Sequence, residues 1–258
     1  MRIVNEKKTN RLDQAVVRRG LVLTRSQAES FIRLGKVEVN GKVVKKTGYN
    51  VQPKDTIRVT EVDRYVSRAG LKLASVAQAL QVDFQDKVVL DVGSSTGGFT
   101  DYALQHGAKR VVAVDVGTNQ LHPTLRNDAR IELHEQLDIR HLTLDARLAE
   151  RNPGVQLLTS SIDLVVIDVS FISLRDILPH IKTLCGQKTQ VLAMVKPQFE
   201  AGALHKNKGV IKNERMRRDI LQDFESWAKQ HFKLVEKADS QVVGEKGNRE
   251  RFYMLRAL

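Results

Sequence analysis

The stretch KVVLDVGSSTGGFT, residues 87–100, decides the fold. It begins as a short apolar run of the kind that forms a buried strand, and it then turns into glycines and hydroxyl residues that precede a helical pattern. Gly93, Gly97 and Gly98 allow the backbone to approach a ligand closely, although their spacing is not G-x-G-x-x-G. A tight turn without a ligand is the alternative, but hydroxyl residues between the glycines favour a pocket.

Apolar runs alternate with helical stretches after this turn. Further strands are expected at 110–116, 131–133, 162–170 and 190–196, and helices at 99–105, 139–150, 173–184 and 214–231. This alternation is typical of a parallel sheet covered by helices on both faces. The last two strands, 232–239 and 251–255, are joined by a segment too short for a helical crossover, so they should form an antiparallel hairpin. The sequence predicts a Rossmann-like α/β domain with a seven-stranded sheet and a C-terminal antiparallel hairpin.

Polar residues stand at the ends of several predicted strands. Asp115 closes the second strand 24 positions after Asp91, where a carboxylate can accept hydrogen bonds from ribose hydroxyls. Asp138 could meet an adenine amino group or cap the helix before Ile139. Asp168 and Lys196 end two further strands, so both should lie at the carboxyl edge beside the glycine turn. Asp168 could instead cap the turn that follows it.

The first quarter of the chain has a different pattern. Two short helices are expected at 11–19 and after Thr24, with Gln27 as a capping-box partner, and Gly35 should end the second helix. Strands at 36–39 and 42–44 flank Asn40-Gly41, a strong hairpin signal, and a third strand is expected at 56–59. The sequence therefore predicts a small α+β domain over residues 1–62, a linker over 63–67 and the larger domain over 68–258.

Charge is concentrated in that first domain. Residues 1–64 contain 15 Lys and Arg against 7 Asp and Glu, so this quarter carries +8 of the net charge of +12. A local basic surface favours a partner that carries many phosphates, and mere solubility is the alternative.

Cys185 is the only cysteine, which excludes an intramolecular disulfide. With no apolar run long enough to cross a bilayer, we expect a cytoplasmic protein without stable membrane association. The oligomeric state stays open.

The stretch RLDQAVVRRGLVLTRSQAESFIRLGKVEVNGKVVKKTGYNVQPKDTIRV, residues 11–59, resembles the small RNA-binding domain first known from ribosomal protein S-four. The resemblance implies that five residues face RNA phosphates: Arg11, Arg25, Ser26, Arg33 and Lys36. Each of these could instead serve only solubility. Such a domain accompanies several chemistries, so the activity must be inferred from the rest of the chain.

The segments SRAGLKL, LDVGSSTGGFTD, AVDVGTNQL, IDVSFISL, VKPQFE and GNRE resemble the TlyA family of hemolysin-named ribosomal-RNA 2'-O-methyltransferases, which is related to the FtsJ methyltransferases. The resemblance implies methyl transfer from S-adenosylmethionine to a ribose hydroxyl of ribosomal RNA, free or in a ribosomal subunit, with a cytidine as the target. Lys72, Asp168, Lys196 and Glu250 would be the catalytic residues. Lys196 would be the base or would orient the hydroxyl, while Lys72 would favour the neutral form of Lys196 or hold the nucleotide.

The same resemblance assigns supporting roles. Asp168 would anchor Lys196 and face the sulfonium, and Glu250 would complete the pocket. Considered alone, Lys72 could be a solvated helix residue and Glu250 a surface charge. The implied cofactor contacts, to which the strand residue Asp91 is added, are Asp91, Gly93, Ser94, Ser95, Thr96, Gly97, Phe99, Asp115, Val116 and Asp138.

Further RNA contacts are expected outside the first domain. Arg68 follows the linker, and a basic stretch from Lys206 to Arg218, with Lys206 and Lys208 as its first cations, is expected to form a flap over the RNA; a solvated helix start is the alternative. Arg64-Tyr65-Val66 is one residue shorter than the junction of some relatives, which leaves a linker-dependent switch open. The chain ends soon after its last strand, whereas longer members modify both subunits, so a large-subunit site is favoured.

Three other functions compete with this interpretation. A membrane-active hemolysin would need a long apolar segment or a strongly amphipathic helix, and neither is evident. An inactive RNA-binding ribosome-assembly factor is disfavoured by residues at all four catalytic positions. A nicotinamide enzyme is disfavoured by the glycine spacing and by the terminal hairpin.

Overall fold

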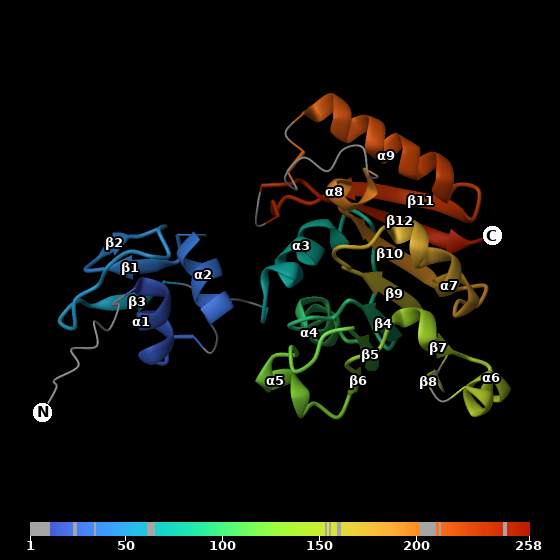
Figure 1. Cartoon of the computed structure of the whole chain (residues 1–258), viewed down its shortest axis with the longest axis horizontal. Coiled ribbons are helices and arrows are strands. Elements are labelled where there is room, and N and C mark those ends of the chain that lie inside the picture. The colour runs from blue at the N-terminus through green and yellow to red at the C-terminus, as the bar shows by residue number, and fades with distance from the viewer. Residues whose placement is uncertain are drawn as a thin grey trace, which may run out of the picture. The chain divides into compact units, whose positions relative to one another are not determined.

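A computed structural model describes residues 11–22, 25–33, 35–60, 65–152, 154, 156–158, 161–201, 210–211, 213–244 and 247–258, without the side chains of residues 26, 27, 30 and 148. The chain divides into two compact units, Met1–Arg64 and Tyr65–Leu258 (Figure 1). Tyr65 is 2% exposed and packs on Tyr102 at a ring-centroid distance of 5.2 Å. Part of the stretch expected to be a linker therefore packs inside the second unit.

The first unit is a small α+β fold. Its elements are α1 (Leu12–Arg18), α2 (Arg25–Arg33), β1 (Val37–Val39), β2 (Lys42–Val43) and β3 (Ile57–Val59). The three strands form an antiparallel sheet in the order β2-β1-β3, and the turn between β1 and β2 has positive φ at Asn40 and Gly41, as expected of Asn-Gly. Leu12, Val16 and Ile32 are fully buried in its core. The cap expected at Thr24 lies outside the described residues.

The second unit is built on one seven-stranded sheet. Its strands are β4 (Val88–Val92), β5 (Arg110–Val114), β6 (Ile131–His134), β9 (Leu164–Ile167), β10 (Gln190–Val195), β11 (Phe232–Asp239) and β12 (Arg251–Ala257). The order is β11-β12-β10-β9-β4-β5-β6, with β12 antiparallel to both of its neighbours and the core strands parallel. The seven strands and the inverted hairpin predicted from the sequence are confirmed.

Helices cover both faces of this sheet, as Figure 1 shows. One face packs against α3 (Arg68–Ala77) and α4 (Gly98–Gln105), and the other packs against α7 (Leu178–Thr183) and α9 (Glu214–Ala228). Shorter helices are α5 (Pro123–Arg126), α6 (Ala146–Arg151), α8 (Pro197–Glu200), η1 (Ile139–His141) and η2 (Leu174–Asp176). Consecutive strand residues point to opposite faces, so each core strand contributes apolar side chains to both layers.

The helix expected over 139–150 is wrong. The structure has the single-turn helix η1, then β7 (Leu142–Thr143), and only then α6. β7 pairs in parallel with β8 (Gln156–Leu157), and Leu158 N donates to the carbonyl of Thr143 at 2.6 Å. Tertiary strand pairing overrides the local helical pattern here, because Leu142 and Leu158 are buried in the core under the sheet.

Candidate functional site

Side-chain alternation brings three predicted catalytic residues to one face of the sheet. Val166 on β9, Met194 on β10 and Phe252 on β12 all belong to the core beneath α3 and α4. Asp168, Lys196 and Glu250 each stand two positions from one of these residues, so they continue the same face toward the carboxyl edge. Val195 pairs with Arg251, which places Glu250 beside Lys196 across neighbouring strands.

The four predicted catalytic side chains form two ion pairs. Lys196 Nζ lies 2.5 Å from Asp168 Oδ1 and donates a hydrogen bond to Ser170 Oγ at 2.7 Å. Lys72 Nζ, which extends from α3 over the same face, lies 3.2 Å from Glu250 Oε1. None of the four side chains is more than 15% exposed. The structure therefore brings these residues to one edge of the sheet, each lysine with its own carboxylate.

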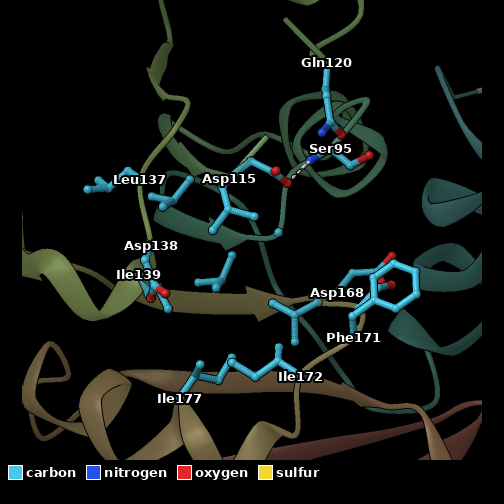
Figure 2. Close-up of a pocket in the computed structure, with 16 residues that line it drawn as sticks. Ser95, Asp115, Gln120, Leu137, Asp138, Ile139, Asp168, Phe171, Ile172 and Ile177 are labelled. Carbon is cyan, nitrogen blue, oxygen red and sulfur yellow. Dashed lines mark hydrogen bonds between the residues drawn. The ribbon is translucent and has the colours of Figure 1, made fainter. Parts of the chain in front are cut away.

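A cavity of about 360 Å³ opens at this edge, between the ends of β4, β5 and β9. Figure 2 shows Leu137, Asp138 and Ile139 at one end of the cavity and Asp168 with Phe171 at the other. Asp168 thus belongs both to the cavity lining and to the ion pair with Lys196. The cavity and the ion-paired residues form one continuous site.

The glycine turn forms the wall of the cavity beside β4. Gly93 has φ +80°, and a Cβ atom on it would lie 2.8 Å from the carbonyl oxygen of Asp168, so any side chain there would collide with the backbone. Asp115, at the end of β5, accepts a hydrogen bond from Ser95 N at 2.8 Å (Figure 2). It also accepts one from Gly117 N at 2.7 Å. These bonds hold a carboxylate at the cavity while leaving oxygen lone pairs free to accept further donors.

Asp138 has a structural partner as well as a place in the cavity lining. It caps η1 by accepting from Arg140 N at 2.9 Å, and the Arg140 guanidinium donates to both of its oxygens, at 2.9 and 2.6 Å. The guanidinium hydrogen bonds lower the pKa of Asp138 to about 2. The capping interpretation is therefore confirmed, and the ionised carboxylate still faces the cavity.

Not every predicted cofactor residue lines the cavity. Gly93, Ser95, Asp115, Val116 and Asp138 do, whereas Asp91, Ser94, Thr96, Gly97 and Phe99 do not. The carboxylate of Asp91 accepts a hydrogen bond from Thr100 Oγ1 at 2.6 Å inside the core. Phe99 packs against Phe252 at 6.0 Å between ring centroids. Asp91 and Phe99 are therefore buried in the core and do not face the cavity.

Part of the lining was not predicted from the sequence. Gln120, Leu137, Ile139, Val169, Ser170, Phe171, Ile172 and Ile177 also face the cavity. Phe171 is the most distinctive, because it is 90% exposed at a positive φ of 69° and lies 5.3 Å from the Phe199 ring. A phenylalanine among serines directly after a strand end was the available signal, in the segment Asp168-Val-Ser-Phe.

The cavity fits an elongated nucleoside with a positive charge at one end. Apolar side chains of Val116, Leu137 and Ile139 can enclose a flat base, and Asp115 can accept from sugar hydroxyls. Asp168, the partner of Lys196 in one ion pair, supplies a carboxylate at the far end. S-adenosylmethionine has this arrangement of base, sugar and sulfonium.

Some of the cations predicted to bind RNA form ion pairs with acidic residues of the first unit. Arg11 and Arg25 both pair with Asp13, which is fully buried, at 3.0 and 2.9 Å. Arg33 lies 3.9 Å from Glu29, and the Lys36 ammonium lies 6.0 Å from the centre of the Phe31 ring. Three of the predicted contacts, the Ser26 side chain, Lys206 and Lys208, lie outside the described residues.

Arg68 has an intramolecular role in the structure. Its Nη2 donates to the carbonyl of Val243 at 2.5 Å, which ties α3 to the loop between β11 and β12.

Within the described part of the chain, no group of His, Cys, Asp or Glu side chains could hold a metal ion. In the same residues, every helix is too short or too polar to span a bilayer.

Comparison with known proteins yields matches to both units. Residues 65–257 match the FtsJ-like methyltransferase family, and residues 10–57 match the S4 domain. The 16S/23S rRNA (cytidine-2'-O)-methyltransferase TlyA of Mycobacterium tuberculosis is 36% identical, over 95% of this chain and 89% of the relative. The 23S rRNA (cytidine-2'-O)-methyltransferase TlyA of Campylobacter jejuni is 33% identical, over 92% and 96%. A solved structure described as a hemolysin, from Streptococcus thermophilus, has a TM-score of 0.72 at 35% identity, over 96% of this chain and 88% of that one.

Proposed function

Because the chain belongs to the FtsJ-like methyltransferase family, we propose that it methylates a ribose 2'-hydroxyl of ribosomal RNA, with S-adenosylmethionine as donor. One observation carries the assignment of the reacting residues. Asp168 lines the cavity and also forms an ion pair with Lys196. A methyl donor bound in the cavity and the lysine that acts on the ribose hydroxyl would therefore both lie next to Asp168.

The cavity residues would hold the cofactor by its three parts. Val116, Leu137 and Ile139 would enclose the adenine, with Asp138 at its edge, and Asp115 would accept from the ribose hydroxyls. The bound cofactor supplies an electrophilic methyl carbon. Asp168 at the far end of the cavity would hold this end of the cofactor by charge attraction.

Lys196 would act on the ribose hydroxyl. Its nitrogen is fixed from two sides, by Asp168 and by Ser170, so it presents a defined direction to an incoming oxygen. Holding the two reactants in line is the main requirement of a methyl transfer, and it accounts for a large part of the rate. In its neutral form Lys196 would accept the hydroxyl proton. Lys72 and Glu250 would complete the site beside it.

We further propose that the methylated nucleotide is a cytidine in the RNA of the large ribosomal subunit. Both methyltransferase relatives are named for cytidine, and 23S appears in both names whereas 16S appears in one. A ribosomal substrate would place the chain in the cytoplasm. Mapping of ribose methylation in both ribosomal RNAs, from cells with and without this protein, tests the assignment directly. A site that depends on the protein only in the small subunit would contradict the large-subunit proposal.

Two substitutions at Lys196 test its role in methyl transfer to ribosomal RNA. Lys196→Ala should lower the single-turnover rate by at least about a hundredfold, the scale of general acid–base catalysis, with RNA affinity largely kept. Lys196→Arg keeps the charge, but a guanidinium cannot accept the proton, so the rate should stay low. Activity near wild type in the alanine variant would contradict the assignment. Recovery in the arginine variant alone would limit Lys196 to orienting the hydroxyl.

A further inference from the structure

Arg217 is a buried cation on a helix whose other arginines face solvent. It is 6% exposed, while Arg215 and Arg218 on α9 are exposed. Its Nε donates to the carbonyl of Arg249 at 3.1 Å, and its Nη2 donates to Asp239 Oδ1 at 2.6 Å. Arg249 immediately precedes Glu250. The sequence places Arg217 in the basic flap, but in the structure its guanidinium is used inside the protein.

Asp239 extends this contact to the other side of Glu250. It ends β11, and it accepts from Arg251 Nε at 2.7 Å and from Arg251 Nη2 at 3.0 Å. The residue before Glu250 and the residue after it are therefore both tied to the Arg217–Asp239 ion pair. Asp239 also precedes Ser240, whose N donates to the carbonyl of Glu250 at 3.0 Å.

Glu250 depends on this support, because it follows an irregular loop. Gly247 has φ +93°, and residues 247–250 belong to no helix or strand. The Glu250 carboxylate is 3% exposed; its Oε1 contacts Lys72, and its Oε2 has no hydrogen-bond partner among the described residues. Because a single hydrogen bond orients this carboxylate, its direction also depends on the backbone that carries it.

We propose that Arg217 is a positioning residue for Glu250, acting through the Arg249 peptide and Asp239. α3 holds the side chain of Glu250 through Lys72, and α9 holds its backbone through Arg217. Arg217 is not among the residues that line the donor cavity. The inference rests on the proposed function, in which Glu250 completes the methyl-transfer site.

A double-mutant cycle tests the proposal with full-length protein. Arg217→Gln, Glu250→Gln and the double variant are compared by single-turnover transfer of tritiated methyl groups to saturating ribosomal subunits, taken from cells that lack the protein. Each single variant should be at least about tenfold slower, the loss that a small misplacement of a reacting group can cause. The double variant should be no slower than Glu250→Gln, because both changes act through one carboxylate. Multiplying losses in the double variant would overturn the proposal.

Binding measurements separate positioning from RNA contact. The ribosomal RNA affinity of Arg217→Gln should stay within about twofold of wild type, a smaller change than removal of one phosphate-binding cation would cause. A large loss of affinity would assign Arg217 to RNA binding and overturn the proposal. Arg217→Lys keeps the ion pair with Asp239 but not both hydrogen bonds, so its rate should lie between wild type and Arg217→Gln. Arg256→Gln, an exposed change at the far end of β12, is the control and should match wild type.

A second variant keeps the proposal testable if Arg217→Gln does not fold. If Arg217→Gln melts below the assay temperature, Asp239→Asn replaces it in the same cycle with Glu250→Gln, and the same absence of an additional loss is expected. A wild-type protein that transfers no methyl group to any ribosomal RNA would contradict the proposed function instead. An active wild type with an equally fast, folded Arg217→Gln would contradict the positioning role alone.

Discussion

Asp91 is a carboxyl group with no exposed surface, on the strand that leads into the glycine turn. Burial raises its pKa to about 7, against the opposing hydrogen bond from Thr100 and with a further contribution from the nearby charge of Asp168. One of its oxygens is buried without a hydrogen-bond partner within the described structure. Such a group is easier to keep buried when it carries its proton.

This pKa predicts how the free energy of unfolding depends on pH. The unfolded chain releases the Asp91 proton near pH 4, whereas the folded chain keeps it to about pH 7, so stability falls as pH rises between these values. Relative to Asp91→Asn, which cannot titrate, the wild type should lose up to about 1.4 kcal/mol per pH unit over this range. Urea unfolding of both proteins from pH 4.5 to 7.5, values chosen to span about this window, measures the difference. A difference that does not change with pH would contradict the prediction.

Residue types at strand ends were the most informative part of the sequence. Asp115, Asp168 and Lys196 lie where their positions after apolar runs predicted, because parallel strands expose their carboxyl ends at one edge. Phe171 and Arg217 could not be assigned this way. Phe171 is exposed at a positive φ, and Arg217 contacts Asp239 and Arg249, which lie 22 and 32 residues away in sequence.

At the scale of elements, the sequence predicted the seven strands of the large sheet and the helices α4 and α9, but it missed the strands β7 and β8. β-Branched runs such as VVLDV and LVVI have a local pattern strong enough to specify a buried strand. The segment after Asp138 lacked such a signal. Its two-residue strand β7 exists because β8 pairs with it, and a partner fourteen residues away is invisible to local periodicity.

The packing of α3 against α4 gives a prediction for one glycine. A Cβ atom on Gly98 would lie 2.8 Å from both Gly70 N and the Ala69 side chain, so α3 would have to move. Because α3 carries Lys72, Gly98→Ala should lower the methyl-transfer rate as well as stability, the latter by about 1–3 kcal/mol, which is typical of overpacking. Thermal melting and single-turnover assays measure both. Gly186→Ala, whose Cβ would meet Thr189 Oγ1 only at 3.7 Å, is the matched control. Equal behaviour of the two variants would contradict the packing argument.

At the scale of the whole molecule, the candidate site and much of the positive charge lie in different units. The four ion-paired residues and the cavity all belong to the second unit, while the first unit holds much of the positive charge. In the first unit Lys42, Lys45 and Lys46 are exposed, and none of them has an ion pair among the described residues. We therefore expect these lysines to contribute to RNA affinity and to have little effect on the methyl-transfer step.

Replacement of the three lysines by glutamine tests this division. Removal of each phosphate-binding charge should reduce the slope of log affinity against log salt by about 0.7–0.9, so the triple variant should bind ribosomal RNA more weakly and with a shallower slope. Its single-turnover rate at saturating RNA should equal that of wild type. Lys188, Lys229 and Lys233 are exposed at the opposite, amino edge of the large sheet, and their triple replacement removes the same charge. An equal loss of slope in both variants would mean that net charge, and not the surface of the first unit, drives RNA binding.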